Sequence, residues 1–175
     1  MKEAAVDLWD LCGRVEVMCI TTNGTIKQNG RAVMGRGCAL EAKTRFRDID
    51  LWLGGLLRAH GNIPLFLGLV DIYKVWTRYE VRTPLREAST SHLSELWSFP
   101  VKHTWNQRAD LELIRWSAHL LREQMGDRDV EVVIPRPGCG NGGLEWGSVR
   151  AALSTLLDER FTFIDRAPVS PQVVG

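Results

Sequence analysis

Apolar and polar residues follow two recurring patterns along the chain, and these patterns divide it into strand-like and helix-like segments. Continuous apolar runs rich in β-branched residues predict strands that are buried on both faces. Apolar residues that recur on one face at helical spacing predict amphipathic helices. The predicted strands are 15–21, 63–73, 95–101, 130–135 and 161–165. The predicted helices are 38–47, 50–60, 110–125 and 145–160, with the second interrupted by the Gly54-Gly55 pair.

Strands that alternate with helices predict an α/β domain with a largely parallel sheet. In such sheets a ligand lies beyond the carboxyl ends of the strands. Two glycine-rich loops are expected there, at 23–37 and 137–143, and each leads directly into a helix. Helix N-termini present unpaired N–H groups that attract phosphate. The pattern therefore predicts one phosphate-bearing ligand between two loops.

Length and composition narrow the class of protein. The chain has 175 residues, which suits one domain over residues 1–166 followed by a loosely ordered tail at 167–175. Its formal net charge of +1 gives no bulk attraction to nucleic acid or to a membrane surface, although one site can still bind a nucleic-acid substrate. The four cysteines form no C-x-x-C pair and no zinc spacing. We therefore expect a reduced, cytoplasmic chain with no metal and no membrane partner.

The second loop also matches a dinucleotide-binding pattern. Gly138 to Gly143 read "GCGNGG", which satisfies G-x-G-x-x-G between a predicted strand and a predicted helix. An acid at the end of the next strand, Asp165, follows at about the usual distance. Only residues 166–175 remain after it, too few for the further βα units of a Rossmann sheet. No G-K-S or G-K-T occurs, so a P-loop is also excluded. The glycines are thus predicted to hold a diphosphate in another kind of site.

The order of the segments "VDLWD", "NGRAVMGRGCA", "FPVKHTW" and "PGCGNGGLEW" resembles that of the macrodomain family, which binds ADP-ribose. It is most similar to the branch with the terminal ADP-ribose protein glycohydrolase and the antitoxins that remove ADP-ribose from DNA. This resemblance implies a three-layer α/β/α sandwich with a mixed, mainly parallel central sheet. It also implies a monomer that needs no cofactor.

The resemblance assigns binding roles to individual residues. Asp7 would accept a hydrogen bond from the adenine amine, with Asp10 as the alternative acid one turn later. Asn23 would contact the distal ribose. The first loop would grip phosphate and ribose through Met34, Gly35, Arg36, Gly37 and Cys38. The second loop would wrap the diphosphate and distal ribose through Gly138, Cys139, Gly140, Asn141, Gly142 and Gly143.

Lys102 is the residue to which the resemblance gives a chemical role, beside C1″ of the distal ribose. A lysine amine can act as a nucleophile or as an acid or base. His103 is a candidate proton relay, although a lone histidine is more often structural. The terminal glycohydrolase has an aspartate at the position of Gly142. Either Lys102 works without that acid, or a water activated by a substrate phosphate attacks C1″.

The expected activity is hydrolysis of mono-ADP-ribose from a modified acceptor, and an acyl ester on a protein Asp or Glu is the favoured acceptor. Three alternatives remain at this stage. The first is cleavage from a nucleobase in DNA, the second is removal of phosphate from ADP-ribose-1″-phosphate, and the third is ADP-ribose binding without turnover. Trp105 could line the substrate edge. Lys27 and Arg31 could rim the site, but solvated surface charges are the simpler explanation.

Overall fold

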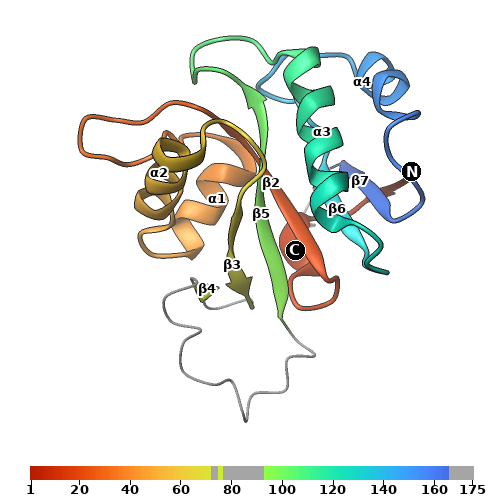
Figure 1. The fold of residues 1–175 in the computed structure, drawn as a ribbon, viewed down its shortest axis with the longest axis horizontal. Coiled ribbons are helices and arrows are strands. Elements are labelled where there is room, and N and C mark those ends of the chain that lie inside the picture. Colours follow the sequence, from red (N-terminus) through yellow and green to blue (C-terminus); the bar gives the residue numbers. More distant parts are fainter. Residues whose placement is uncertain (72–74, 77–92, 166–175) are drawn as a thin grey trace, which may run out of the picture.

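The protein forms three layers, with a central sheet between two pairs of helices (Figure 1). The computed structural model describes residues 1–71, 75–76 and 93–165. Helices α1 and α2 cover one face of the sheet, and α3 and α4 cover the other. The elements are β1 (Lys2–Ala5), a 3-10 helix η1 (Leu8–Leu11), β2 (Val17–Asn23), α1 (Gly37–Arg45), α2 (Ile49–His60), β3 (Phe66–Val70), β4 (Val75–Trp76), β5 (Ser94–Lys102), α3 (Leu111–Met125), β6 (Val132–Pro135), α4 (Trp146–Leu153) and β7 (Phe161–Asp165). This arrangement confirms the predicted α/β/α sandwich.

The sheet has seven strands in the order β1-β7-β6-β2-β5-β3-β4. The first five are parallel to their neighbours, while β3 is antiparallel to β5 and β4 is antiparallel to β3. The sheet is therefore mixed and mainly parallel, as expected. Because parallel strands end at the same edge, the carboxyl ends of β1, β7, β6, β2 and β5 all lie there.

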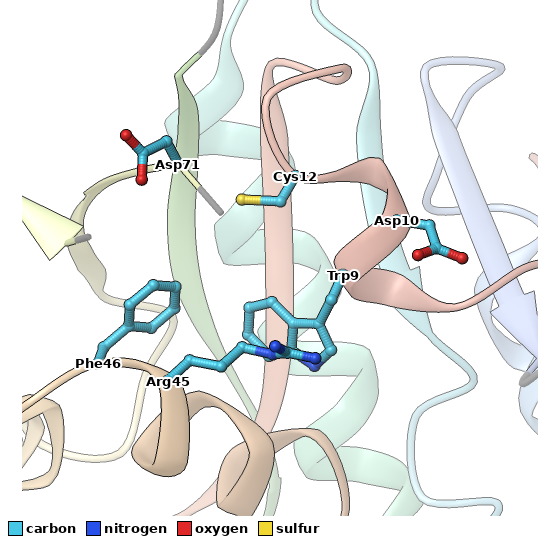
Figure 2. Close-up of a pocket in the computed structure, with 6 residues that line it drawn as sticks. All are labelled: Trp9, Asp10, Cys12, Arg45, Phe46 and Asp71. Carbon is cyan, nitrogen blue, oxygen red and sulfur yellow. The ribbon is translucent and has the colours of Figure 1, made fainter. Parts of the chain in front are cut away.

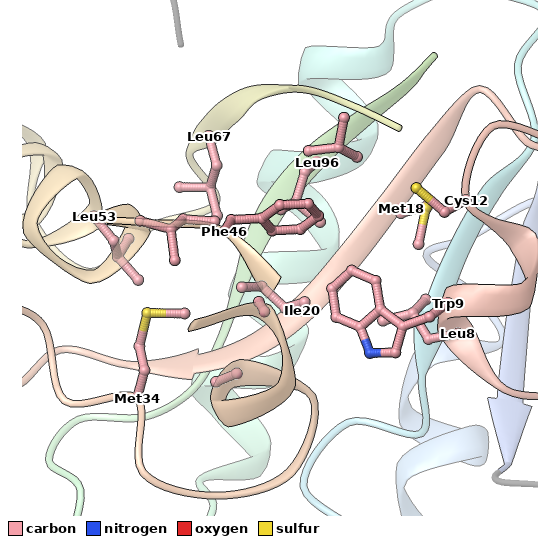
Figure 3. Close-up of a cluster of buried hydrophobic side chains, with 14 of the residues drawn as sticks. Leu8, Trp9, Cys12, Met18, Ile20, Met34, Phe46, Leu53, Leu67 and Leu96 are labelled. Atoms are coloured by element: carbon pink, nitrogen blue, oxygen red, sulfur yellow. The ribbon is translucent and has the colours of Figure 1, made fainter. Parts of the chain in front are cut away.

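Each face of the sheet buries its own hydrophobic cluster. One cluster packs α1, α2 and η1 against Met18 and Ile20 of β2, and Figure 3 shows Phe46, Leu53 and Met34 pointing into it. The other cluster packs α3 and α4 against strand side chains that point to the opposite face of the sheet, such as Val17 and Cys19 of β2. Burial on both faces explains why β2, β5 and β6 read as continuous apolar runs rather than as alternating ones.

Three predicted elements differ from the structure. Helix α2 runs through Gly54 and Gly55 without interruption. A Cβ on Gly54 would lie 2.0 Å from the carbonyl oxygen of Gly30, so this glycine lets a loop backbone pack on the helix rather than breaking it. Helix α4 ends at Leu153 instead of continuing to 160, because a turn there brings Leu157 into the core. Strand β3 is shorter than predicted and begins only at Phe66.

The sequence pattern did not reveal β1. Its four residues are exposed and lack the β-branched side chains that mark a strand. Parallel pairing with β7 makes it the edge strand of the sheet. The predicted tail at 167–175 lies outside the described residues.

Candidate functional site

Four of the loops at the carboxyl edge contain the predicted site residues. They follow β1, β2, β5 and β6, and those after β2, β5 and β6 gather at the top of Figure 1. From β1 to β5 the sheet crosses four strand intervals of about 4.8 Å, or roughly 19 Å. An edge of this width fits an elongated ligand.

The first loop presents backbone rather than side chains to this edge. Gly35, Arg36 and Gly37 are exposed, whereas Met34 is buried in the core (Figure 3). The thiol of Cys38 accepts a hydrogen bond from the Thr21 backbone N–H at 3.3 Å, so this side chain also faces the protein. Among the residues that the structure describes, no side chain caps the N-terminus of α1, and Gly37 begins the helix with a φ of +57°. The loop therefore offers the backbone and the positive end of a helix to an anion.

The second loop is folded by close contacts that require glycine. Gly138 has a φ of +76°, and a Cβ there would lie 2.8 Å from the Ala109 Cβ. A Cβ on Gly142 would lie 2.3 Å from the carbonyl oxygen of Gly138 and 2.7 Å from the Ala109 Cβ. By contrast, a Cβ on Gly140 would meet no atom of the described residues within 4 Å. A side chain on Gly142 would thus point into packed protein, whereas one on Gly140 would point away from these residues.

The two loops lie against each other, and the second has unpaired donors at its tip. A Cβ on Gly37 would lie 3.8 Å from the side-chain amide nitrogen of Asn141. Within residues 1–71 and 93–165, the backbone N–H groups of Gly140 and Asn141 donate to no protein acceptor. Cys139 is half-buried, and burial raises the pKa of its thiol. Successive free N–H groups of this kind form an anion-binding nest.

Lys102 reaches from the end of β5 to this second loop. Its amine donates a hydrogen bond to the carbonyl oxygen of Asn141 at 2.9 Å. The side chain is half-buried. The structure therefore brings the predicted catalytic lysine to the same loop as the predicted diphosphate-binding glycines.

His103, the next residue, pairs with a carboxylate that the sequence prediction did not include. Its Nε2 lies 2.9 Å from Oδ2 of Asp110, and the other oxygen of Asp110 accepts from the N–H of Glu112 at the start of α3. The hydrogen bond from His103 lowers the pKa of the Asp110 carboxyl below its ordinary value. An acid directly before an amphipathic helix is a typical capping signal, so the sequence could have identified the cap but not the histidine partner.

Asn23 and Asp7 have internal roles in the structure. The Asn23 amide donates to the carbonyl oxygen of Val33 at 2.9 Å and accepts from the Thr25 N–H at 3.0 Å, which closes the base of the loop. Asp7 caps η1 by accepting from the Trp9 N–H at 2.9 Å. Both residues lie at the carboxyl edge, but their predicted contacts with ribose and adenine remain predictions.

The loop after Asn23 turns at Asn29 and Gly30 and folds back onto α2. Gly30 has a φ of +82°. The Arg31 guanidinium binds Asp50 at 2.6 Å and Asp48 at 2.8 Å, so Arg31 anchors the loop to the start of α2 rather than rimming a ligand. Lys27 is exposed.

A cavity of about 140 Å³ lies away from the two glycine-rich loops, beside η1 and the end of α1. Figure 2 shows Arg45 lying along the Trp9 ring in this cavity, with its guanidinium carbon 5.0 Å from the ring centre. Burial raises the pKa of the Cys12 thiol there to about 11. Of the residues that the sequence predicts for the site, it contains only Asp10, the alternative adenine acid.

Two searches of the described residues bear on other classes of function. Within residues 1–71, 75–76 and 93–165, no group of three His, Cys, Asp or Glu side chains is arranged to bind a metal ion. In the same residues, no helix has both the length and the apolar character to cross a membrane.

Comparisons with known proteins give similarity in structure only. No protein-family model and no curated protein matches the sequence. Among solved structures, the macrodomain of Mycobacterium tuberculosis DarG is 19% identical with a TM-score of 0.62, over 95% of this chain and 97% of that one. The macrodomain of Thermus aquaticus DarG is 22% identical with a TM-score of 0.63, over 95% of this chain and 97% of that one.

A third structure, Thermosipho africanus DarTG in complex with ADP-ribose, is 20% identical with a TM-score of 0.66. The match covers 97% of this chain and 42% of that one. Near-complete coverage by separate macrodomains agrees with the strand order and the layers described above. The chain therefore has the macrodomain fold.

Proposed function

We propose that this macrodomain binds ADP-ribose at the carboxyl edge of its sheet and hydrolyses the bond between C1″ and a modified acceptor. The observation that carries the proposal is the contact of the Lys102 amine with the second glycine-rich loop, at 2.9 Å from the Asn141 carbonyl oxygen. This places an amine beside the backbone donors suited to a diphosphate. The DarTG structure, part of which has this fold, is a complex with ADP-ribose and supports the choice of ligand.

In this proposal the ligand extends along the edge. The diphosphate lies between the N-terminus of α1 and the free N–H groups of Gly140 and Asn141. The adenine lies toward Asp7 at the end of β1, and the distal ribose lies toward Lys102 at the end of β5. Because backbone N–H groups supply most of the anion contacts, the site needs little positive charge from side chains.

Lys102 acts on C1″ in one of two ways. As a nucleophile, its amine attacks C1″, and the acceptor leaves with the electron pair of the broken bond. Loss of a proton from the amine and opening of the C1″–O4″ bond give an imine, which water hydrolyses to ADP-ribose and free lysine. As an acid or base, Lys102 transfers a proton while water attacks C1″.

The favoured acceptor is the carboxylate of a protein Asp or Glu side chain, joined to C1″ as an acyl ester. Such a carboxylate is a good leaving group, so cleavage needs little acid catalysis. This suits a site where Gly142 has no room for a carboxylate of its own.

A nucleobase is the second candidate acceptor, and Trp105 favours it. The Trp105 side chain is 60% exposed on the loop that follows Lys102. Its backbone N–H donates a hydrogen bond to the Thr25 hydroxyl at 3.0 Å, which holds this part of the loop in place. An exposed aromatic ring three residues after Lys102 can stack on a base.

Release of ADP-ribose from three substrates tests the proposal. These are a glutamate-modified protein, a thymidine-modified oligonucleotide and ADP-ribose-1″-phosphate, each incubated with the wild type and with Lys102→Ala. We expect Lys102→Ala to bind ADP-ribose with wild-type affinity and to lose turnover by about a hundredfold or more. Binding of ADP-ribose with no release from any substrate would instead identify a reader. Turnover that survives in Lys102→Ala would remove this residue from the mechanism.

A further inference from the structure

Three successive carbonyl groups at the end of β5 are each fixed by a different segment of the chain. The Val101 carbonyl accepts from the Asp110 N–H at 2.9 Å, and the His103 carbonyl accepts from the Gly24 N–H at 3.1 Å. The carbonyl of Lys102, between them, accepts from the side-chain amide of Asn62 at 3.0 Å. Lys102 is thus the one residue of the three whose carbonyl depends on a side chain.

The strand is irregular at this point. Thr22 of β2 pairs with Pro100, but the next residue, Asn23, pairs with Lys102, so Val101 is an extra residue on β5. Pro100 has no N–H to donate to a neighbouring strand. Bulges of this kind change the direction of the side chain that follows them. The direction of Lys102 is therefore set by local contacts rather than by regular pairing.

Asn62 is tightly enclosed where it meets Lys102. A Cβ on Gly24 would lie 2.9 Å from the Asn62 side-chain carbon Cγ, so only glycine fits beside it. The Asn62 oxygen Oδ1 is buried, and within the described ranges 1–71 and 93–165 it has no partner. An unpaired buried oxygen is unfavourable, and an apolar side chain of similar size would avoid it. Packing alone does not account for asparagine here, whereas donation to the Lys102 carbonyl does.

We propose that Asn62 is a positioning residue for Lys102. By fixing the carbonyl after the bulge, it holds the lysine backbone so that the amine reaches the second loop and the C1″ position beside it. This inference rests on the proposed function, because Lys102 is the group that it positions. A displacement of about 1 Å at a reacting group can lower the rate by about a hundredfold.

The test compares Asn62→Ala and Asn62→Asp with a matched control, Gln124→Ala. Gln124 on α3 donates its side-chain amide to the Pro64 carbonyl at 3.2 Å, so the control removes the same kind of hydrogen bond from the same loop. We expect both Asn62 variants to lose turnover by about tenfold to a hundredfold. KM and ADP-ribose affinity should stay close to those of the control in both variants, and the melting temperature should do so in Asn62→Ala.

A second readout does not require activity. In ¹³C-lysine-labelled protein, the Lys102 side-chain NMR signals, assigned with Lys102→Arg, should show a fixed environment in wild type and in Gln124→Ala. They should average in Asn62→Ala. If the wild type cleaves no substrate, the proposed function fails, but the NMR signals still test the positioning role. Turnover and Lys102 signals in Asn62→Ala that match those of Gln124→Ala would overturn it.

Discussion

Gly142 stands where the resemblance places a catalytic aspartate, and the structure leaves no room there for any side chain. Its Cβ would lie 2.3 Å from the Gly138 carbonyl oxygen, 2.7 Å from the Gly138 Cα and 2.7 Å from the Ala109 Cβ. Two of these atoms belong to the backbone and cannot rotate away. We therefore predict that Gly142→Asp does not restore a catalytic acid and instead distorts the second loop.

The size of the effect follows from the contacts. Forcing a methyl group into a packed site costs about 1–3 kcal/mol, so Gly142→Ala should lower the free energy of unfolding by that amount. For a chain of this length, the melting temperature should fall by roughly 2 to 12 °C. Gly140→Ala is the matched control, since its Cβ would lie in open space. The free energy of unfolding of this control should equal that of the wild type or exceed it by about 0.4–1 kcal/mol, because alanine lowers the conformational entropy of the unfolded chain.

Urea unfolding and calorimetric titration with ADP-ribose measure both consequences. We expect Gly142→Ala and Gly142→Asp to be less stable than Gly140→Ala, and to bind ADP-ribose more weakly than the wild type does. The displaced loop would also separate Asn141 from the Lys102 amine. The reasoning is refuted if Gly142→Asp melts with the wild type and turns over substrate faster, because the aspartate would then reach the site.

Three further predictions concern other parts of the molecule. The free energy of unfolding measured in urea should be about 2–4 kcal/mol lower for Gly54→Ala than for Gly55→Ala, because only the first places a methyl group against the Gly30 backbone. Equal free energies of unfolding would contradict this. Burial alone would raise the pKa of Asp50, but hydrogen bonds from Lys43 and Arg31 outweigh it, so the pKa lies below its ordinary value. This carboxylate therefore stabilises the fold above about pH 4 and less as the pH falls further, and Asp50→Asn should cost on the order of 2 kcal/mol at pH 7 and much less at pH 3. If the wild type and Asp50→Asn differed in free energy of unfolding by the same amount at pH 7 and at pH 3, the predicted role of this carboxylate would be contradicted. Trp105→Ala should slow release from a modified oligonucleotide about tenfold and leave release from a modified protein unchanged if the ring stacks on a base; equal effects in kinetic assays would exclude a base-specific role.

The main elements of the fold could be predicted from sequence because buried side chains follow a regular pattern along each strand and helix. Strand β5 and helix α3 lie close to their predicted bounds. Strand β5 is almost entirely buried, and the buried residues of helix α3 recur on one face. Strand β1 escaped prediction because its stability comes from pairing with β7, 160 residues later in the chain, and not from its own side chains. The continuity of α2 likewise depends on a contact between Gly54 and Gly30 that no local pattern encodes.

In the candidate site, too, some features have a local sequence signal and others depend on contacts between distant residues. Glycine-rich loops placed directly after buried strands carry a local signal, and they do lie together at the carboxyl edge. The inward direction of Gly142 depends on Ala109, which belongs to another loop. Asn62 carries no sequence signal at all, because its contact with Lys102 joins residues 40 positions apart through a bulge. Sequence reasoning therefore brought the two glycine-rich loops together but missed the residues that set their geometry.

A crystal structure of the chain with ADP-ribose bound tests the central claim most directly. The account predicts that the diphosphate lies between the N-terminus of α1 and the N–H groups of Gly140 and Asn141. It also predicts that C1″ of the distal ribose faces the Lys102 amine, which exchanges its contact with the Asn141 carbonyl for the ligand. ADP-ribose bound instead in the cavity beside Trp9 and Arg45, or with its distal ribose turned away from Lys102, would contradict it.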